Sequence, residues 1–250
     1  MHRNDWTRDQ LILAFNLYCK IPFGRIDHRN PEIIVLANAI GRSPSAVSWK
    51  LSNFASLDPS LKARRIAGAR HGAKADKEIW DEFSGDWDRL VYESERLMLQ
   101  IKGAAPKEEE LFPEGKSIEA IVKVRINQGF FRSAVLATYN MRCCVTGLSF
   151  PELLNASHIV PWRIDSKNRT NPRNGLCLNA IHDRAFDCGL LTITTDYSVK
   201  LSPVIQRATK DDSLVAFFRV YDRVQINMPS RFKPDPEFLK YHNEEVFRKQ

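Results

Sequence analysis

The sequence contains no long hydrophobic run. A helix that crosses a membrane needs about 20 consecutive, mainly apolar residues, and no such stretch occurs in the 250 residues. The first segment, Met1-His-Arg-Asn-Asp-Trp-Thr-Arg-Asp-Gln10, is polar and lacks the apolar core of a signal peptide. We therefore expect a cytoplasmic protein without a membrane partner.

Cysteine is scarce as well. The five cysteines are an odd number without regular spacing, which predicts reduced thiols and no disulfide framework. Cys144-Val-Thr-Gly147 lacks the second cysteine of a Cys-x-x-Cys pair, and Cys177 and Cys188 have no such partner. Because four zinc ligands at standard spacing are missing, we predict no structural zinc.

Acidic residues do not balance the basic ones. The chain has 37 Lys+Arg against 30 Asp+Glu, a net charge of +7. Residues 1–102 carry 16 against 13, or +3, and residues 103–250 carry 21 against 17, or +4. This sign favours a polyanion as partner, with a basic protein that has no nucleic-acid role as the alternative.

Apolar residues recur at helical spacing through the first hundred residues. The pattern predicts helices over residues 7–18, 31–40, 44–54 and 76–100. The second and third are joined by the short turn Gly41-Arg-Ser43, which is typical of a helix-turn-helix. Ser48 and Lys50 are the expected DNA-binding side chains on its outer face. A helical hairpin that only packs is the alternative.

Residues 103–116 combine glycine, proline and a run of glutamates, which predicts a linker. We expect residues 1–102 to form a helix-turn-helix-like DNA-recognition domain and residues 117–250 to form a second domain. The second domain mixes helices with short strands, so the predicted fold class is α+β, with a mostly helical first domain.

The second domain carries a compact polar pattern. An apolar segment, expected as a strand, ends at His158; a loop rich in turn residues leads through Asn174 to a second short strand over residues 176–178; and a short helix follows with His182. The order strand, loop, strand, helix places two histidines and an asparagine on rigid supports. Such a site can hold one metal ion beside one general base.

Three blocks of this pattern resemble the HNH endonucleases of the ββα-metal fold, in their restriction-type branch. The blocks are Ala156-Ser-His-Ile-Val-Pro-Trp162, Asn171-Pro-Arg-Asn-Gly-Leu176 and His182-Asp-Arg-Ala-Phe-Asp-Cys-Gly189, and the resemblance covers about residues 125–200. It implies that His158 is the general base, that Asn174 holds the loop and orients His158 through a side-chain hydrogen bond, and that His182 binds one divalent metal ion, Mg²⁺ or Mn²⁺.

One position departs from the family pattern. Many HNH sites have an Asp or His immediately before the base histidine, whereas this sequence has Ser157. We expect Asp187, one helical turn from His182, to complete the metal site; a structural role for Asp187 at the end of its helix is the alternative. Arg132 and Arg163 are the expected DNA contacts beside the site.

The sequence thus predicts a restriction-like endonuclease that hydrolyses double-stranded DNA. The first domain would select either a base sequence or a base modification. Two opposed nicks in a duplex need two sites, which makes a homodimer a further expectation. A DNA-binding regulator with a degenerate, inactive HNH fold is the competing hypothesis, supported by Ser157, and an RNA-directed nuclease is a third.

Overall fold

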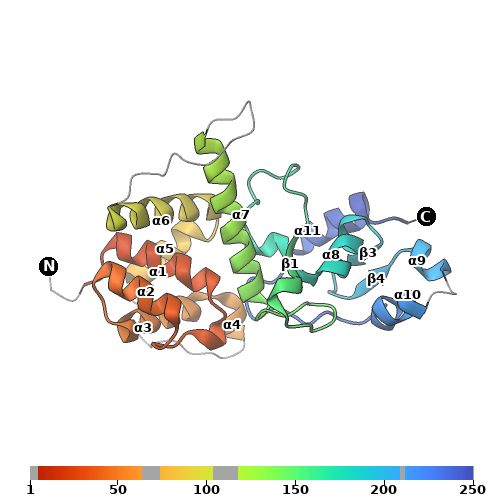
Figure 1. Ribbon diagram of the computed structural model, residues 1–250, viewed down its shortest axis with the longest axis horizontal. Coiled ribbons are helices and arrows are strands. Elements are labelled where there is room, and N and C mark those ends of the chain that lie inside the picture. Colours follow the sequence, from red (N-terminus) through yellow and green to blue (C-terminus); the bar gives the residue numbers. More distant parts are fainter. Residues whose placement is uncertain (1–4, 64–73, 104–117, 209–211, 250) are drawn as a thin grey trace. The chain divides into compact units, whose positions relative to one another are not determined.

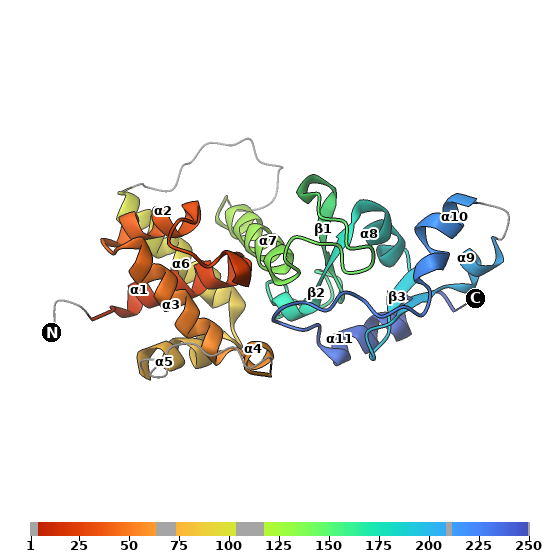
Figure 2. The same ribbon diagram turned by 90° about the horizontal axis from the view of Figure 1, so that it is seen from below.

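The computed structural model of the chain describes residues 5–63, 74–103, 118–208 and 212–249. By its internal contacts the chain divides into two compact units, residues 1–134 and 135–250 (Figures 1 and 2). Apart from Gly103, the linker predicted over residues 103–116 lies outside the described residues. The predicted domain limits stay predictions.

The first unit is helical throughout its described part, as the sequence predicts. Its helices are α1 (Arg8–Lys20), α2 (Pro31–Ile40), α3 (Pro44–Leu57), α4 (Pro59–Ala63), α5 (Lys74–Phe83), α6 (Trp87–Lys102) and α7 (Ile118–Thr138), with a short 3-10 helix η1 (Phe23–Arg25) after α1. Helix α7 continues past Ala134 into the second unit.

Local capping explains where these helices begin. Thr7 caps α1 in a capping box, in which its hydroxyl accepts from the Gln10 amide and the Gln10 side chain accepts from the Thr7 amide. The single helix predicted over residues 76–100 is two helices, because Asp86 accepts from the Arg89 amide and starts α6 anew.

The predicted helix-turn-helix arrangement is present as local structure. Gly41 ends α2 in the left-handed conformation, with φ of 66°, and the Ser43 hydroxyl caps α3 by accepting from the Ala46 amide at 3.2 Å. Val47 and Leu51 on α3 are fully buried. The identity of this unit as a DNA-binding helix-turn-helix remains a prediction.

Lys50 does not lie on the outer face of α3, and this part of the prediction is wrong. Its side chain is 6% exposed, and its ammonium donates to both carboxylate oxygens of Asp76 on α5, at 2.8 and 3.1 Å. The side-chain amide of Asn53 donates to the same carboxylate at 3.0 Å. Lys50 follows Val47 by three residues and therefore shares the buried face of the helix.

Replacing Lys50 with methionine is expected to destabilise the first unit by about 3–5 kcal/mol, because the Asp76 carboxylate would remain buried without its cation. Chemical unfolding of the full chain measures the loss. The double variant Lys50→Met/Asp76→Leu removes both charges and should recover most of the stability. A single variant as stable as wild type would show that the ion pair contributes nothing.

The second unit contains two small antiparallel sheets. Strands β1 (Leu154–His158) and β2 (Gly175–Asn179) pair so that His158 lies opposite Gly175, and α8 (Ala180–Asp187) follows directly and packs on both strands. A second hairpin joins β3 (Leu191–Ile193) to β4 (Val199–Leu201). The order strand, loop, strand, helix is as the sequence predicts.

Short helices complete the second unit. They are the 3-10 turns η2 (Pro151–Leu153) and η3 (Pro172–Asn174), helices α9 (Pro203–Arg207) and α10 (Asp212–Phe217), the 3-10 turn η4 (Arg219–Tyr221), helix α11 (Pro236–Tyr241) and the π-helical turn η5 (His242–Val246). In the described residues no helix is long and apolar enough to cross a membrane.

The C-terminal segment supports α8 through His242. The imidazole stacks on the Phe186 ring, with centroids 3.6 Å apart. Its Nε2–H donates to the Phe186 carbonyl at 3.2 Å, so Nδ1 accepts from the Thr192 hydroxyl at 2.8 Å. Nearby, Gly189 has φ of 68°, and a Cβ atom there would lie 2.1 Å from the Val246 carbonyl oxygen. The close approach of Val246 requires a glycine at position 189, and burial favours the neutral form of His242.

Acid is expected to destabilise the second unit through His242. Burial lowers its pKa to about 4 in the folded protein, against about 6.5 in the unfolded chain. The unfolded state therefore binds the proton first, and up to ~3 kcal/mol of stability, complete above the unfolded pKa, is lost as the pH falls toward 4. Denaturant unfolding between pH 7 and 4 measures this slope. His242→Phe should flatten it, and an unchanged slope would contradict the assignment.

Candidate active site

His158 ends β1 at the edge of the ββα unit. Its Nε2 lies 2.9 Å from the Arg169 carbonyl oxygen. A carbonyl oxygen only accepts, so Nε2 carries the hydrogen and, in the neutral ring, Nδ1 carries the lone pair. The Trp162 ring meets the imidazole edge-on, with centroids 5.5 Å apart. The ring is thus fixed in the tautomer that offers Nδ1 as a base.

The environment of His158 favours its neutral form. Burial lowers the pKa of the imidazole, and the hydrogen bond to the Arg169 backbone opposes this shift in part. A neutral imidazole is the form that can take a proton from water. His158 is therefore ready to act as a base at pH values below the ordinary pKa of histidine.

Asn174 holds the chain beyond His158 through hydrogen bonds from its side chain to backbone groups. Its side-chain oxygen accepts from the Val160 amide at 2.8 Å, and its nitrogen donates to the carbonyls of Val160 at 3.1 Å and Asn168 at 3.2 Å. Its backbone carbonyl accepts from Ile159. The predicted hydrogen bond to His158 is thereby corrected: Asn174 fixes the strand end and the loop that carries Arg169, and the Arg169 carbonyl fixes the ring.

His182 lies on the first turn of α8 in the opposite tautomer. The Asn179 side-chain oxygen accepts from the backbone amides of Ile181 and His182, at 3.1 and 2.9 Å, and lies 2.9 Å from His182 Nδ1. An amide oxygen only accepts, so Nδ1 carries the hydrogen and Nε2 the lone pair. Sequence reasoning missed Asn179, although an asparagine directly before a helix is a typical cap.

Nε2 of His182 is buried and has no hydrogen-bond partner. The residue is 1% exposed, and the rings of Phe218 and Tyr221 lie 5.2 and 5.7 Å from its centroid. Burial lowers its pKa, while the nearby Phe217 backbone opposes the shift without forming a hydrogen bond of normal geometry to Nε2. A ligand reaches Nε2 only when these residues shift.

Asp187 is placed apart from His182. Five residues along an α-helix correspond to a rotation of about 140°, so Asp187 leaves α8 on another side, where it is exposed. Partial desolvation of its carboxylate and the neighbouring charge of Asp183 raise the pKa of Asp187. The Asp183 carboxylate accepts a hydrogen bond from the side-chain amide of Asn155 at 2.8 Å. The role of Asp187 as a metal ligand remains a prediction.

The donor atoms present fit a metal site in which the protein supplies only a few of the ligands. In the described part of the chain, no three His, Cys, Asp or Glu side chains come together as a metal cluster. His182 Nε2 and Ser157 Oγ are both buried without a partner, however, and β1 packs against α8. One imidazole nitrogen and one hydroxyl suit an ion that takes its other ligands from water and a substrate phosphate.

The remaining predicted contacts are scattered. Ser48 is half-buried on α3. Arg132 is exposed on α7 in the first unit, and Arg163 is exposed in the loop after His158. All five cysteines are free thiols. The DNA-binding roles of Ser48, Arg132 and Arg163, and the predicted absence of structural zinc, remain predictions.

Comparison with known proteins supports the resemblance for part of the second unit. A family described as HNH endonuclease matches residues 143–194, which run from the turn before β1 to the end of β3. No curated protein matches the chain. The matched segment contains His158, Asn174 and His182.

Proposed function

We propose that the protein is a metal-dependent endonuclease that hydrolyses phosphodiester bonds in double-stranded DNA. The match of residues 143–194 to a family described as HNH endonuclease supports this proposal. The observation that carries the proposal is the pair of opposite tautomers. His158 offers Nδ1 beside a loop, and His182 offers a buried Nε2 lone pair. One suits proton transfer and the other suits a metal ion.

His158 is the proposed general base. Its Nδ1 takes a proton from the water that attacks the phosphorus, and the bond from phosphorus to the leaving oxygen breaks. The Arg169 carbonyl keeps the ring oriented and stabilises the imidazolium that forms, because Nε2–H remains donated to it. Asn174 keeps the loop and the strand end together during this step.

His182 is the proposed metal ligand, and the buried hydroxyl of Ser157 on β1 is a proposed second donor. A bound divalent ion, Mg²⁺ or Mn²⁺, supplies Lewis-acid stabilisation of the charge that develops on the phosphate. Asn179 holds the His182 ring and leaves Nε2 as the donor atom. Arg163, exposed next to Trp162, is a proposed phosphate contact.

The first unit is proposed to select the DNA. The exposed part of α3 carries Ser45, Trp49 and the half-buried Ser48, and Arg132 is proposed to contact a phosphate. With DNA selection in the first unit and cleavage in the second, the protein would act as a restriction-like enzyme. It would pair as a homodimer when both strands are cut.

Incubation with supercoiled plasmid tests the proposal. Nicked and linear DNA are expected with Mg²⁺ or Mn²⁺, and no product is expected with a chelator. Plain, methylated and hydroxymethylated plasmids identify what the first unit reads. Binding without cleavage on all three substrates would contradict the proposal and favour the inactive regulator. Faster cleavage of RNA in the same buffer would replace DNA as the substrate.

A further inference from the structure

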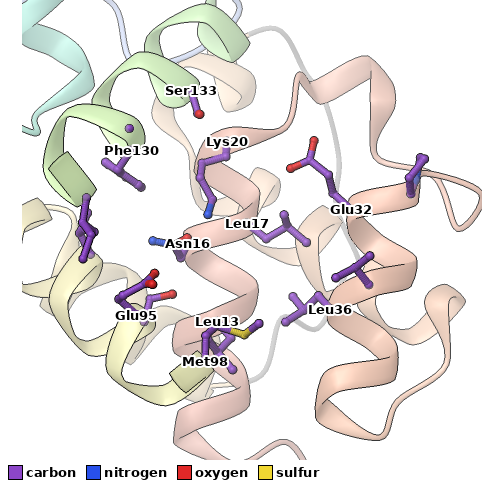
Figure 3. Close-up of a pocket in the computed structure, with 16 residues that line it drawn as sticks. Leu13, Asn16, Leu17, Lys20, Glu32, Leu36, Glu95, Met98, Phe130 and Ser133 are labelled. Atoms are coloured by element: carbon purple, nitrogen blue, oxygen red, sulfur yellow. The ribbon is translucent and has the colours of Figure 1, made fainter. Parts of the chain in front are cut away.

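A pocket of about 550 Å³ lies within the first unit. It is lined by α1, the start of α2, α6 and the part of α7 that belongs to the same unit (Figure 3). Its volume falls in the range of pockets that hold small organic ligands, roughly 300–1,000 Å³. Its walls are largely apolar and include Leu13, Leu17, Leu36, Met98 and the Phe130 ring.

Two buried polar side chains line the pocket without a protein partner. Asn16 on α1 is 5% exposed and Ser94 on α6 is 6% exposed. Among the described residues neither side chain hydrogen-bonds to another protein group. The amide and the hydroxyl line one cavity, where together they can bond a ligand that both donates and accepts hydrogen bonds.

Charged groups restrict the ligand further. The Lys20 side chain enters the same pocket, where Figure 3 shows it turned toward Asn16. Burial lowers the pKa of its ammonium, and the carboxylates of Glu32 and Glu95 oppose that shift. One cation against two carboxylates gives the pocket a negative charge, which disfavours a phosphate dianion. A neutral ligand does not meet this penalty.

We propose that this pocket binds a neutral nucleobase, either as a free nucleoside or as a base turned out of DNA. A nucleobase has apolar faces for the leucines and Phe130, and an edge with donors and acceptors for Asn16, Ser94 and Lys20. The choice of a nucleobase among neutral heterocycles rests on the proposed function, since DNA is the substrate of that function.

Calorimetric titration of the full chain with adenosine, guanosine, cytidine and thymidine tests the proposal without any cleavage step. At least one nucleoside should bind, and more tightly than its 5′-monophosphate. Ser94→Ala and Lys20→Met should each weaken binding about tenfold, the usual effect of one lost hydrogen bond in a buried site. Ser52→Ala is the matched control, because that helix serine bonds the Ser48 carbonyl outside the pocket.

A single-stranded oligonucleotide, titrated into the His158→Ala protein, distinguishes the two sources of the base. Tighter binding of the oligonucleotide, weakened by Ser94→Ala, assigns the pocket to DNA; binding of the free nucleoside alone assigns it to a small-molecule effector. No binding of either probe, tighter binding of the monophosphate, or binding that Ser94→Ala and Lys20→Met leave unchanged would overturn the proposal. The binding experiments do not depend on DNA cleavage, so the pocket proposal can fail while the proposed nuclease function stands, and the reverse.

Discussion

His158→Ala is expected to lower DNA cleavage by about 10²–10⁴-fold, the usual contribution of a positioned general base. The imidazole is held with Nε2–H on the Arg169 carbonyl, so the variant removes the only atom of that side chain, Nδ1, that can take the proton from water. Time courses of plasmid nicking with Mn²⁺ measure the loss. The melting temperature of the variant is measured beside the rate, because the ring also contacts Trp162 and the Arg169 carbonyl.

His28→Ala is the matched control, since that imidazole is exposed in the first unit. It should cut at the wild-type rate. Equal cutting by His158→Ala and wild type would remove His158 from the reaction. If both variants lost activity together with thermal stability, the loss would be assigned to folding and not to chemistry.

The pH dependence of cleavage is a second consequence of the same environment. Burial lowers the pKa of His158 below that of an ordinary histidine, about 6.5. A lowered pKa keeps the base form present at lower pH, so kcat/KM should begin to fall only below that ordinary value. An acid limb centred above it would show that another group limits the reaction.

Sequence patterns predicted the structure correctly where residues that are close in the sequence are also close in space. The two strands of the site and α8 are contiguous, and their order follows from apolar runs and turn residues in the sequence. His158 and His182 could be identified for the same reason. Gly189 was visible as the end of a block, but its purpose was not, because the carbonyl that excludes a Cβ there belongs to Val246.

Long-range partners account for what sequence reasoning missed. The Lys50 prediction failed because its partner, Asp76, lies on another helix, although the apolar residues three before and one after Lys50 already indicated a buried face. Phe218 and Tyr221, which cover His182, come from a segment beyond the second hairpin and carry no local signal. The Arg169 carbonyl is a backbone group, which no side-chain pattern reveals.

His182→Ala is expected to abolish metal binding at the site and to lower cleavage by about 10²–10³-fold, as several kcal/mol of charge stabilisation are lost. The variant removes the buried Nε2 lone pair. The Asn179 oxygen keeps this lone pair available, because it accepts the hydrogen of Nδ1 and so fixes the tautomer. Titration of Mn²⁺ followed by electron paramagnetic resonance measures binding without relying on activity.

Variants of Asn179 separate the capping role from the role in metal binding. Asn179→Ala should cost about 1 kcal/mol of stability, because Ile181 and His182 lose their cap, and should weaken Mn²⁺ binding about 10–100-fold, as loss of the group that orients a ligand does. Asn179→Asp keeps an acceptor for all three donors and should retain both properties. Mn²⁺ binding that persists in His182→Ala would place the ion elsewhere, and the buried lone pair would then need another ligand.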